Sequence, residues 1–162
     1  MSIVGAKVIR KEDPNLLTGR GQYVDDIQLT GITHMAFVRS TEAHALIKGI
    51  DVSAALECEG VIGAWTAADL ELPPLPEVPG LERPTLATDK VRFVGEAVAV
   101  IVAENKYAAA DGTELVVVDY DPLEAVTNIE EATKDDAPLL FEELGSNTVA
   151  EVPSADDHQA VF

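Results

Sequence analysis

The segment that most constrains the fold is a nearly uninterrupted apolar run, Ala97–Ala103. Its length and its β-branched residues are typical of a strand that is buried on both faces. Asn105 follows directly and is a common helix N-cap, so we expect a helix at 106–114, weakened at Gly112. A buried strand that leads into a capped helix indicates a folded domain with its own core.

Strand and helix signals recur on both sides of this unit. We expect further strands at 22–24, 32–39, 45–50, 61–65, 90–94 and 116–120. Short helical segments are expected after polar caps, from Asp51 or Ser53 to Leu56, at 67–70 after Thr66, and at 129–132 after Asn128. Strands and short helices that do not alternate regularly predict an α+β fold.

Two segments are expected to be irregular. Residues 71–84 contain Pro73, Pro74, Pro76, Pro79 and Pro84. Because proline lacks a backbone N–H and disrupts helices and central strands, this segment is predicted to be an extended surface loop. Residues 1–31 are rich in turn-forming residues, and we expect a helical turn there at most.

The chain is strongly acidic, with 29 Asp and Glu against 11 Lys and Arg and a formal net charge of −18. Such a charge repels phosphate backbones and anionic lipid, which argues against nucleic acid and membrane partners. Either a solvated surface or adaptation to a high-salt cytoplasm explains it. No apolar run is long enough to span a bilayer or to resemble a signal peptide core, so a cytoplasmic location is expected.

Catalytic and metal-binding patterns are not apparent in the residues. The single cysteine, Cys58, excludes an internal disulfide and any all-cysteine iron–sulfur site. His34, His44 and His158 are far apart and lack the spacing of metal ligands, so we interpret them as structural. The residues alone predict an α+β domain with no visible active site and no metal or cofactor of its own.

A family resemblance is carried by blocks that follow one another along the chain. Residues 10–26 match the pattern R-x-E-D-P-x-x-L-T-G-x-G-x-Y-x-D-D. Four later blocks follow. The second block comprises 36–40, 43–45 and 50–51, and the third comprises 60–61 and 67–70. The fourth is 91–99 and the fifth is 114–123. In this order they resemble the N-terminal domain of the molybdopterin-binding large subunit of the xanthine dehydrogenase/aldehyde oxidase/carbon monoxide dehydrogenase family. Ala97 stands where that family usually has proline, and Gly112 where alanine is favoured.

The resemblance implies an α/β hammerhead fold over residues 1–150, with 1–31 as an N-terminal strap. It implies a non-catalytic role in structure and subunit docking within a molybdenum hydroxylase. The complete enzyme would hold molybdopterin with molybdenum, [2Fe-2S] clusters and FAD, none of them in this chain. Residues 151–162 resemble the start of the molybdopterin-binding segment. Implied partners are that segment, an iron–sulfur subunit and a flavin subunit. An apolar patch that they leave uncovered would favour self-association.

Eight residues are candidates for subunit contacts or for fixing the family motifs. They are Arg20, Tyr23, Asp25, Asp26, Arg39, His44, Gly95 and Glu96. The first four belong to a strap that is anchored by Tyr23 either on a neighbouring subunit or on the domain's own sheet. Arg39 and His44, with Ser40, are expected to pin a turn by hydrogen bonds or to face another subunit. Gly95 is expected to permit a bend, and Glu96 to pair with Arg92 or Lys90.

Two other functions are compatible with the residues. The first is a free-standing binding module that reuses the hammerhead fold. The second is a carrier domain with a modified lysine, which is disfavoured because Lys90 and Lys106 lack a methionine-flanked hairpin tip. Xanthine, aldehydes, carbon monoxide and aromatic heterocycles are all substrates within the family, so the resemblance selects none of them.

Overall fold

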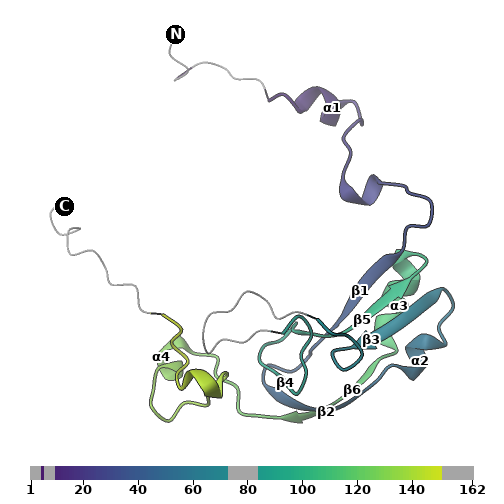
Figure 1. The fold of residues 1–162 in the computed structure, drawn as a ribbon. Helices are drawn as coiled ribbons and strands as arrows, with labels where there is room; N and C mark the ends of the chain where they lie inside the picture. Colours follow the sequence, from purple (N-terminus) through teal and green to yellow (C-terminus); the bar gives the residue numbers. More distant parts are fainter. Residues whose placement is uncertain (1–4, 6–9, 73–83, 151–162) are drawn as a thin grey trace. The chain divides into compact units, whose positions relative to one another are not determined.

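A computed structural model describes Gly5 and residues 10–72 and 84–150 (Figure 1). Two expectations therefore lie wholly or mostly outside the described residues: the proline-rich loop at 71–84 and the segment 151–162. The chain divides into two compact units, Met1–Ile32 and Thr33–Phe162. Each is described by itself below.

The N-terminal unit contains two short helical segments, α1 (Asp13–Leu17) and the 3-10 turn η1 (Val24–Asp26). Helix α1 is the helical turn that the sequence permits, with proline in its first turn. The strand expected at 22–24 is wrong. The Asp26 carboxylate accepts a hydrogen bond from the Tyr23 N–H at 2.9 Å, and the Asp26 N–H donates to the Tyr23 carbonyl at 3.0 Å. This local pairing favours a turn over a strand.

The second unit is built on an antiparallel sheet with the strand order β1–β5–β3. Its strands are β1 (His34–Arg39), β5 (Ala97–Ala103) and β3 (Val61–Thr66). The central strand β5 is hydrogen-bonded on both sides, and Val98, Ala99 and Ile101 are fully buried. The expectation of a strand buried on both faces is confirmed.

A second antiparallel sheet has the order β4–β2–β6. Its strands are β4 (Lys90–Val91), β2 (Ala45–Asp51) and β6 (Val117–Pro122). The strand expected at 90–94 is too long, because β4 ends at Val91. The Glu96 carboxylate accepts the Arg92 N–H at 2.5 Å and bends the backbone away from the ladder.

The helices of this unit are α2 (Ser53–Leu56), α3 (Lys106–Glu114), α4 (Ile129–Ala132) and the 3-10 turn η2 (Glu142–Leu144). The predicted caps of α3 and α4 are confirmed. The Asn105 side chain accepts the N–H groups of Tyr107 and Ala108, each at 3.0 Å, and Asn128 accepts two N–H groups in the same way. Residues 67–70 form a turn rather than a helix, because the Asp69 carboxylate binds the Thr66 N–H and hydroxyl.

Both sheets contribute to one hydrophobic core, and α3 packs on the sheet β1–β5–β3. The fully buried members of the core are small, which brings the two layers close together. They include Ala45, Ala55, Val91, Val98, Ala99 and Ile101. Two small mixed layers with short helices confirm the α+β class.

Gly112 is where α3 approaches the sheet most closely. A Cβ atom at this position would lie 2.9 Å from Ile101 Cγ2 and 3.0 Å from Val61 Cγ2. Both methyl groups belong to β-branched residues that cannot swing aside. The glycine that weakens the helix in the sequence is therefore needed for helix–sheet packing.

We predict that Gly112→Ala lowers the free energy of unfolding by about 1 kcal/mol. Overlap with the two methyl groups costs about 2 kcal/mol, which exceeds the gain of about 1 kcal/mol in helix propensity. The control is Asp111→Ala at the exposed neighbouring position, which should leave stability equal or slightly higher. Urea titration measures both changes. A Gly112→Ala variant that is more stable than the parent would contradict the packing argument.

Candidate functional site

The first group of motif residues ties the end of β1 to the start of β5. Arg39 Nη1 donates to the Gly95 carbonyl, the Gly95 N–H donates to the Ser40 carbonyl, and the Ser40 N–H donates to the Glu96 carbonyl, each at 2.8 Å. Gly95 has a φ of +92°, a conformation that side chains other than glycine rarely adopt. The expected bend at Gly95 and the turn pinned by Arg39 and Ser40 are both present.

Glu96 does not form the ion pair that the sequence suggested. Its carboxylate binds the backbone N–H of Arg92 rather than a cationic side chain. The Lys90 ammonium pairs with Glu142 instead. Glu96 is thus paired with Arg92, one of the two expected partners, but through the backbone N–H, and Lys90 is engaged by Glu142 from a distant segment.

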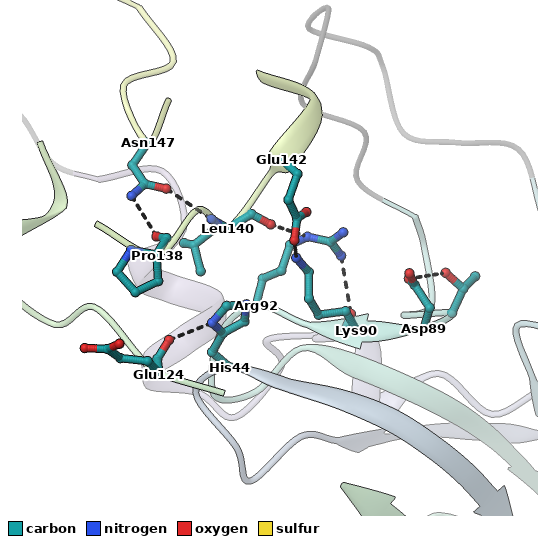
Figure 2. A network of polar contacts seen from close by, with 10 residues as sticks. His44, Asp89, Lys90, Arg92, Glu124, Pro138, Leu140, Glu142 and Asn147 are labelled. Carbon is teal, nitrogen blue, oxygen red and sulfur yellow. Dashed lines mark hydrogen bonds and ion pairs between the residues drawn. The ribbon is translucent and has the colours of Figure 1, made fainter. Parts of the chain in front are cut away.

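His44 is buried beside the segment that follows β6, with 5% of its surface exposed. Its Nδ1 lies 2.8 Å from the Glu124 carbonyl oxygen, and its own carbonyl accepts the Leu123 N–H at 2.8 Å (Figure 2). A carbonyl can only accept a hydrogen bond, so Nδ1 carries a proton in this contact. Nε2 is buried without a hydrogen-bond partner in the part of the chain that the structure describes. These contacts agree with the structural role expected for His44.

The largest polar network joins β4 to residues 140–142 (Figure 2). Lys90 Nζ lies 2.6 Å from Glu142 Oε1, and only 5% of the Lys90 side chain is exposed, against 68% for Glu142. Arg92 Nε donates to the Leu140 carbonyl at 3.0 Å, and the guanidinium carbon lies 4.8 Å from the centre of the Phe141 ring. We call these contacts of Lys90 and Arg92 the β4 anchor. The sequence gives no signal for it, because the partners lie about fifty residues away.

Asn147 completes the anchored segment. Its Oδ1 accepts the Leu140 N–H at 3.1 Å, while Nδ2 donates to the carbonyls of Ala132 and Pro138 at 3.1 and 3.0 Å. One amide side chain therefore satisfies three backbone groups in a stretch with little regular structure. Residues 132–147 are held in place by these bonds and by the β4 anchor.

A pocket of about 430 Å³ lies beside the β4 anchor. Leu70, Leu86 and Phe141 contribute apolar surface, whereas Asp89, Arg92 and Glu143 contribute charge. The Arg92 guanidinium is already engaged with Leu140 and Phe141, so the acidic groups dominate what the pocket offers a ligand. Its volume is within the range of small-molecule sites.

The Lys90 ammonium donates a hydrogen bond to the Glu142 carboxylate and holds the pKa of that carboxyl below its usual value. The backbone N–H of Glu142 lowers the pKa further by a second hydrogen bond. A carboxyl whose pKa is lowered by folding stabilises the fold above its unfolded pKa. This contribution disappears as the pH falls through the folded-state pKa.

Four candidate residues lie in the N-terminal unit. Tyr23 is 66% exposed. The Tyr23 ring and the Leu16 side chain lie beside Gly21. A Cβ atom at Gly21 would lie 3.1 Å from Leu16 Cδ2 and 3.6 Å from Tyr23 Cε2. Asp26 fixes the Tyr23 backbone, as described above, and Asp25 lies exposed in the same turn. The Arg20 N–H donates to the Asn15 carbonyl at 2.8 Å. The structure therefore brings Arg20, Tyr23, Asp25 and Asp26 into one short segment.

The described residues offer no donor set for a metal ion, since no three His, Cys, Asp or Glu side chains among them are grouped suitably. Nor do residues 10–72 and 84–150 include a helix that is long and apolar enough to cross a membrane.

The chain belongs to the aldehyde oxidase and xanthine dehydrogenase family, because residues 18–124 match the family's a/b hammerhead domain. It is 41% identical to the carbon monoxide dehydrogenase large chain of Afipia carboxidovorans over 98% of this chain and 20% of that protein. It is 46% identical to the nicotine 6-hydroxylase large subunit of Paenarthrobacter nicotinovorans over 77% of this chain and 16% of that protein.

The same family is found among solved structures. The Cu,Mo-CO dehydrogenase in its carbon monoxide reduced state superposes with a TM-score of 0.78 and 42% identity, over 93% of this chain and 19% of that chain. The hammerhead fold expected from the sequence motifs is therefore confirmed. The chain spans about a fifth of the length of these relatives.

We predict that Glu142→Gln lowers the free energy of unfolding at pH 7 by about 1 kcal/mol or less, because solvent screens the exposed carboxylate. Glutamine retains the hydrogen bond to Lys90, so the variant removes only the charge. The difference from the parent should shrink as the pH falls below 4.5, the ordinary pKa of the carboxyl. Thermal unfolding between pH 7 and pH 3 measures it. The control Glu143→Gln should show no such pH dependence, and equal behaviour of the two variants would refute the charge effect.

We also predict that Nδ1 of His44 carries a proton in the folded chain. The Glu124 carbonyl requires a donor at Nδ1, as the 2.8 Å contact shows. Long-range ¹H–¹⁵N NMR spectra distinguish protonated from bare ring nitrogens, and His34 serves as the reference ring in the same spectrum. A proton on Nε2 with a bare Nδ1 would show that the contact with Glu124 is not a hydrogen bond.

Proposed function

We propose that this chain is the non-catalytic hammerhead domain of a molybdenum hydroxylase large subunit and acts in structure and subunit docking. One observation supports this most directly: the motif side chains Arg39, His44 and Glu96 all bind backbone groups of their own domain. Groups that are engaged in this way fix the shape of a platform.

The names of two relatives support the proposal that this chain is part of a multi-subunit enzyme. Carbon monoxide dehydrogenase and nicotine 6-hydroxylase each have a "large" chain or subunit, which indicates smaller partners in those proteins. By analogy, the partners of this chain are the molybdopterin-binding remainder of the large subunit, an iron–sulfur subunit and a flavin subunit, in the cytoplasm. Molybdopterin, [2Fe-2S] and FAD belong to those parts of the proposed enzyme.

The N-terminal unit suits a docking role within this proposal. Leu17, Tyr23 and Val24 are 86%, 66% and 83% exposed, which is unusual for three large apolar side chains in so short a segment. An exposed aromatic on a fixed turn is a common anchor at protein interfaces. We propose Tyr23 as that anchor, with Arg20, Asp25 and Asp26 as its polar surround. The anchored surface is either a neighbouring subunit or the domain's own sheet.

The second candidate function is a free-standing binding module. It is favoured by the pocket of about 430 Å³ beside the β4 anchor, which is large enough for a small molecule. A binding module would exist as a short polypeptide, whereas a domain of a hydroxylase would be part of a chain about five times longer.

The experiment that separates the two is an immunoblot of the source organism's extract with antibody to this chain, run beside a molybdenum assay of the fractions. We expect a band several times larger than 17.2 kDa that elutes with molybdenum. A single band at 17.2 kDa would refute the hydroxylase proposal and favour the binding module.

A companion measurement tests the non-catalytic assignment. The isolated 162-residue chain should bind no stoichiometric molybdenum or iron by plasma mass spectrometry and no flavin by absorbance, because its described residues offer no donor set for a metal. The complete native polypeptide is the positive control for molybdenum. One metal ion per isolated chain would contradict the assignment.

A further inference from the structure

The sheet β1–β5–β3 has two faces, and α3 covers one of them (Figure 1). Gly112 of α3 lies against Ile101 and Val61, so these two residues mark the covered face. Residues that pair directly across antiparallel strands share a face, and successive residues alternate. The register therefore places two rows of three residues on the opposite face, each running across β1, β5 and β3. These rows are Met35–Val102–Gly63 and Phe37–Val100–Trp65.

This opposite face is apolar along all three strands. Met35 is 61% exposed, Phe37, Trp65 and Val102 are half-buried, and Val100 is buried between its neighbours Phe37 and Trp65. The Trp65 ring lies over Gly63, where any Cβ would overlap the indole. The ring therefore lies along the sheet and forms part of its surface. We call Met35, Phe37, Trp65 and Val102 the open face.

Within the second unit, the helices that the structure describes do not pack on the open face. Helix α3 contacts β1, β5 and β3 from the other side, and α2 packs against α3 and β3. At one end of the open face, the Arg39 guanidinium lies 5.7 Å from the centre of the Phe37 ring. Among the residues that the structure describes, the Arg39 guanidinium donates to the Gly95 carbonyl, and a guanidinium has five N–H donors.

A second copy of this chain is a poor occupant for the open face. Each chain carries a formal charge of −18, so two copies repel each other. The relatives supply another occupant, because this chain spans 20% of the Afipia carbon monoxide dehydrogenase large chain and 19% of the solved CO dehydrogenase chain. Four-fifths of such a polypeptide remain to pack around this domain.

We propose that the open face is the surface on which the rest of the large subunit docks within the same polypeptide. This inference rests on the proposed function and gives it a location. The docked surface is apolar opposite Met35 and Trp65, and it carries a carboxylate or carbonyl oxygen that accepts from Arg39. Burial of Met35 and Trp65 supplies the attraction, and Arg39 fixes the orientation.

The test is the oxidation rate of Met35 by hydrogen peroxide, followed by mass spectrometry of the peptide that contains it. The rate is measured in the isolated 162-residue chain, in the purified full-length large subunit, and in both after unfolding in urea. We expect Met35 to react at least tenfold more slowly in the folded full-length subunit than in the isolated chain. The unfolded samples should react equally, which controls for the peptide itself.

A pair of variants tests the same face by a different measurement. Met35→Glu and Ile129→Glu both place a charge on an exposed apolar position, since Ile129 is 86% exposed on α4. Neither should change the melting temperature of the isolated chain by more than a few degrees. In the full-length subunit, Met35→Glu should lower the melting temperature or the soluble yield, and Ile129→Glu should not.

The outcomes are distinct. Equal Met35 rates in the isolated chain and in a large full-length subunit would overturn this inference and leave the proposed function standing. Protection that appears only after other subunits are added would assign the face to a separate partner and also overturn it. Protection that rises with the concentration of the isolated chain would assign the face to a second copy. A native polypeptide of 17.2 kDa would refute the proposed function and this inference together.

Discussion

The structure depends on the burial of one strand. β5 forms hydrogen bonds with β1 and β3, and its side chains Val98, Ala99, Ile101 and Ala103 are fully buried. A buried backbone must satisfy its N–H and C=O groups, which an antiparallel ladder on both sides achieves. The small side chains of β5 and the glycine of α3 at position 112 then set how closely the helix can approach. The placement of every other element in this sheet follows from that arrangement.

Polar side chains fix the ends of the sheets by hydrogen bonds to backbone groups. Arg39 and Gly95 close the β1–β5 connection, His44 holds the chain that leaves β6, and the β4 anchor holds residues 140–142. A charged or hydrogen-bonded group that is half-buried stabilises one geometry, because losing one partner leaves the other unsatisfied. Such contacts give the domain a defined shape.

Much of the fold could be predicted from the sequence, because the residues that define these strands and helices act on their immediate neighbours in the chain. The apolar run of β5 and the caps Asn105 and Asn128 act on adjacent residues, and all three expectations were confirmed. The failures at 22–24 and 90–94 share a cause, since in each case a nearby carboxylate binds a backbone N–H and ends or prevents a strand. The β4 anchor and the open face depend on long-range pairing and strand register, which a single sequence does not reveal. The roles of Arg20, Tyr23, Asp25 and Asp26 at an interface stay predictions.

Trp65 is the only tryptophan of the chain, and it lies on the sheet β1–β5–β3, whereas Tyr120 packs against the core from β6 of the other sheet. The two layers therefore carry separate chromophores. Indole emission reports on one sheet, and in a chain with Tyr23→Phe and Tyr107→Phe the remaining tyrosine signal reports on the other. Coincident unfolding curves from the two signals would identify the layers as a single cooperative unit, and separate curves would show that each layer melts on its own. The placement of one aromatic residue thus makes the cooperativity of this fold optically accessible.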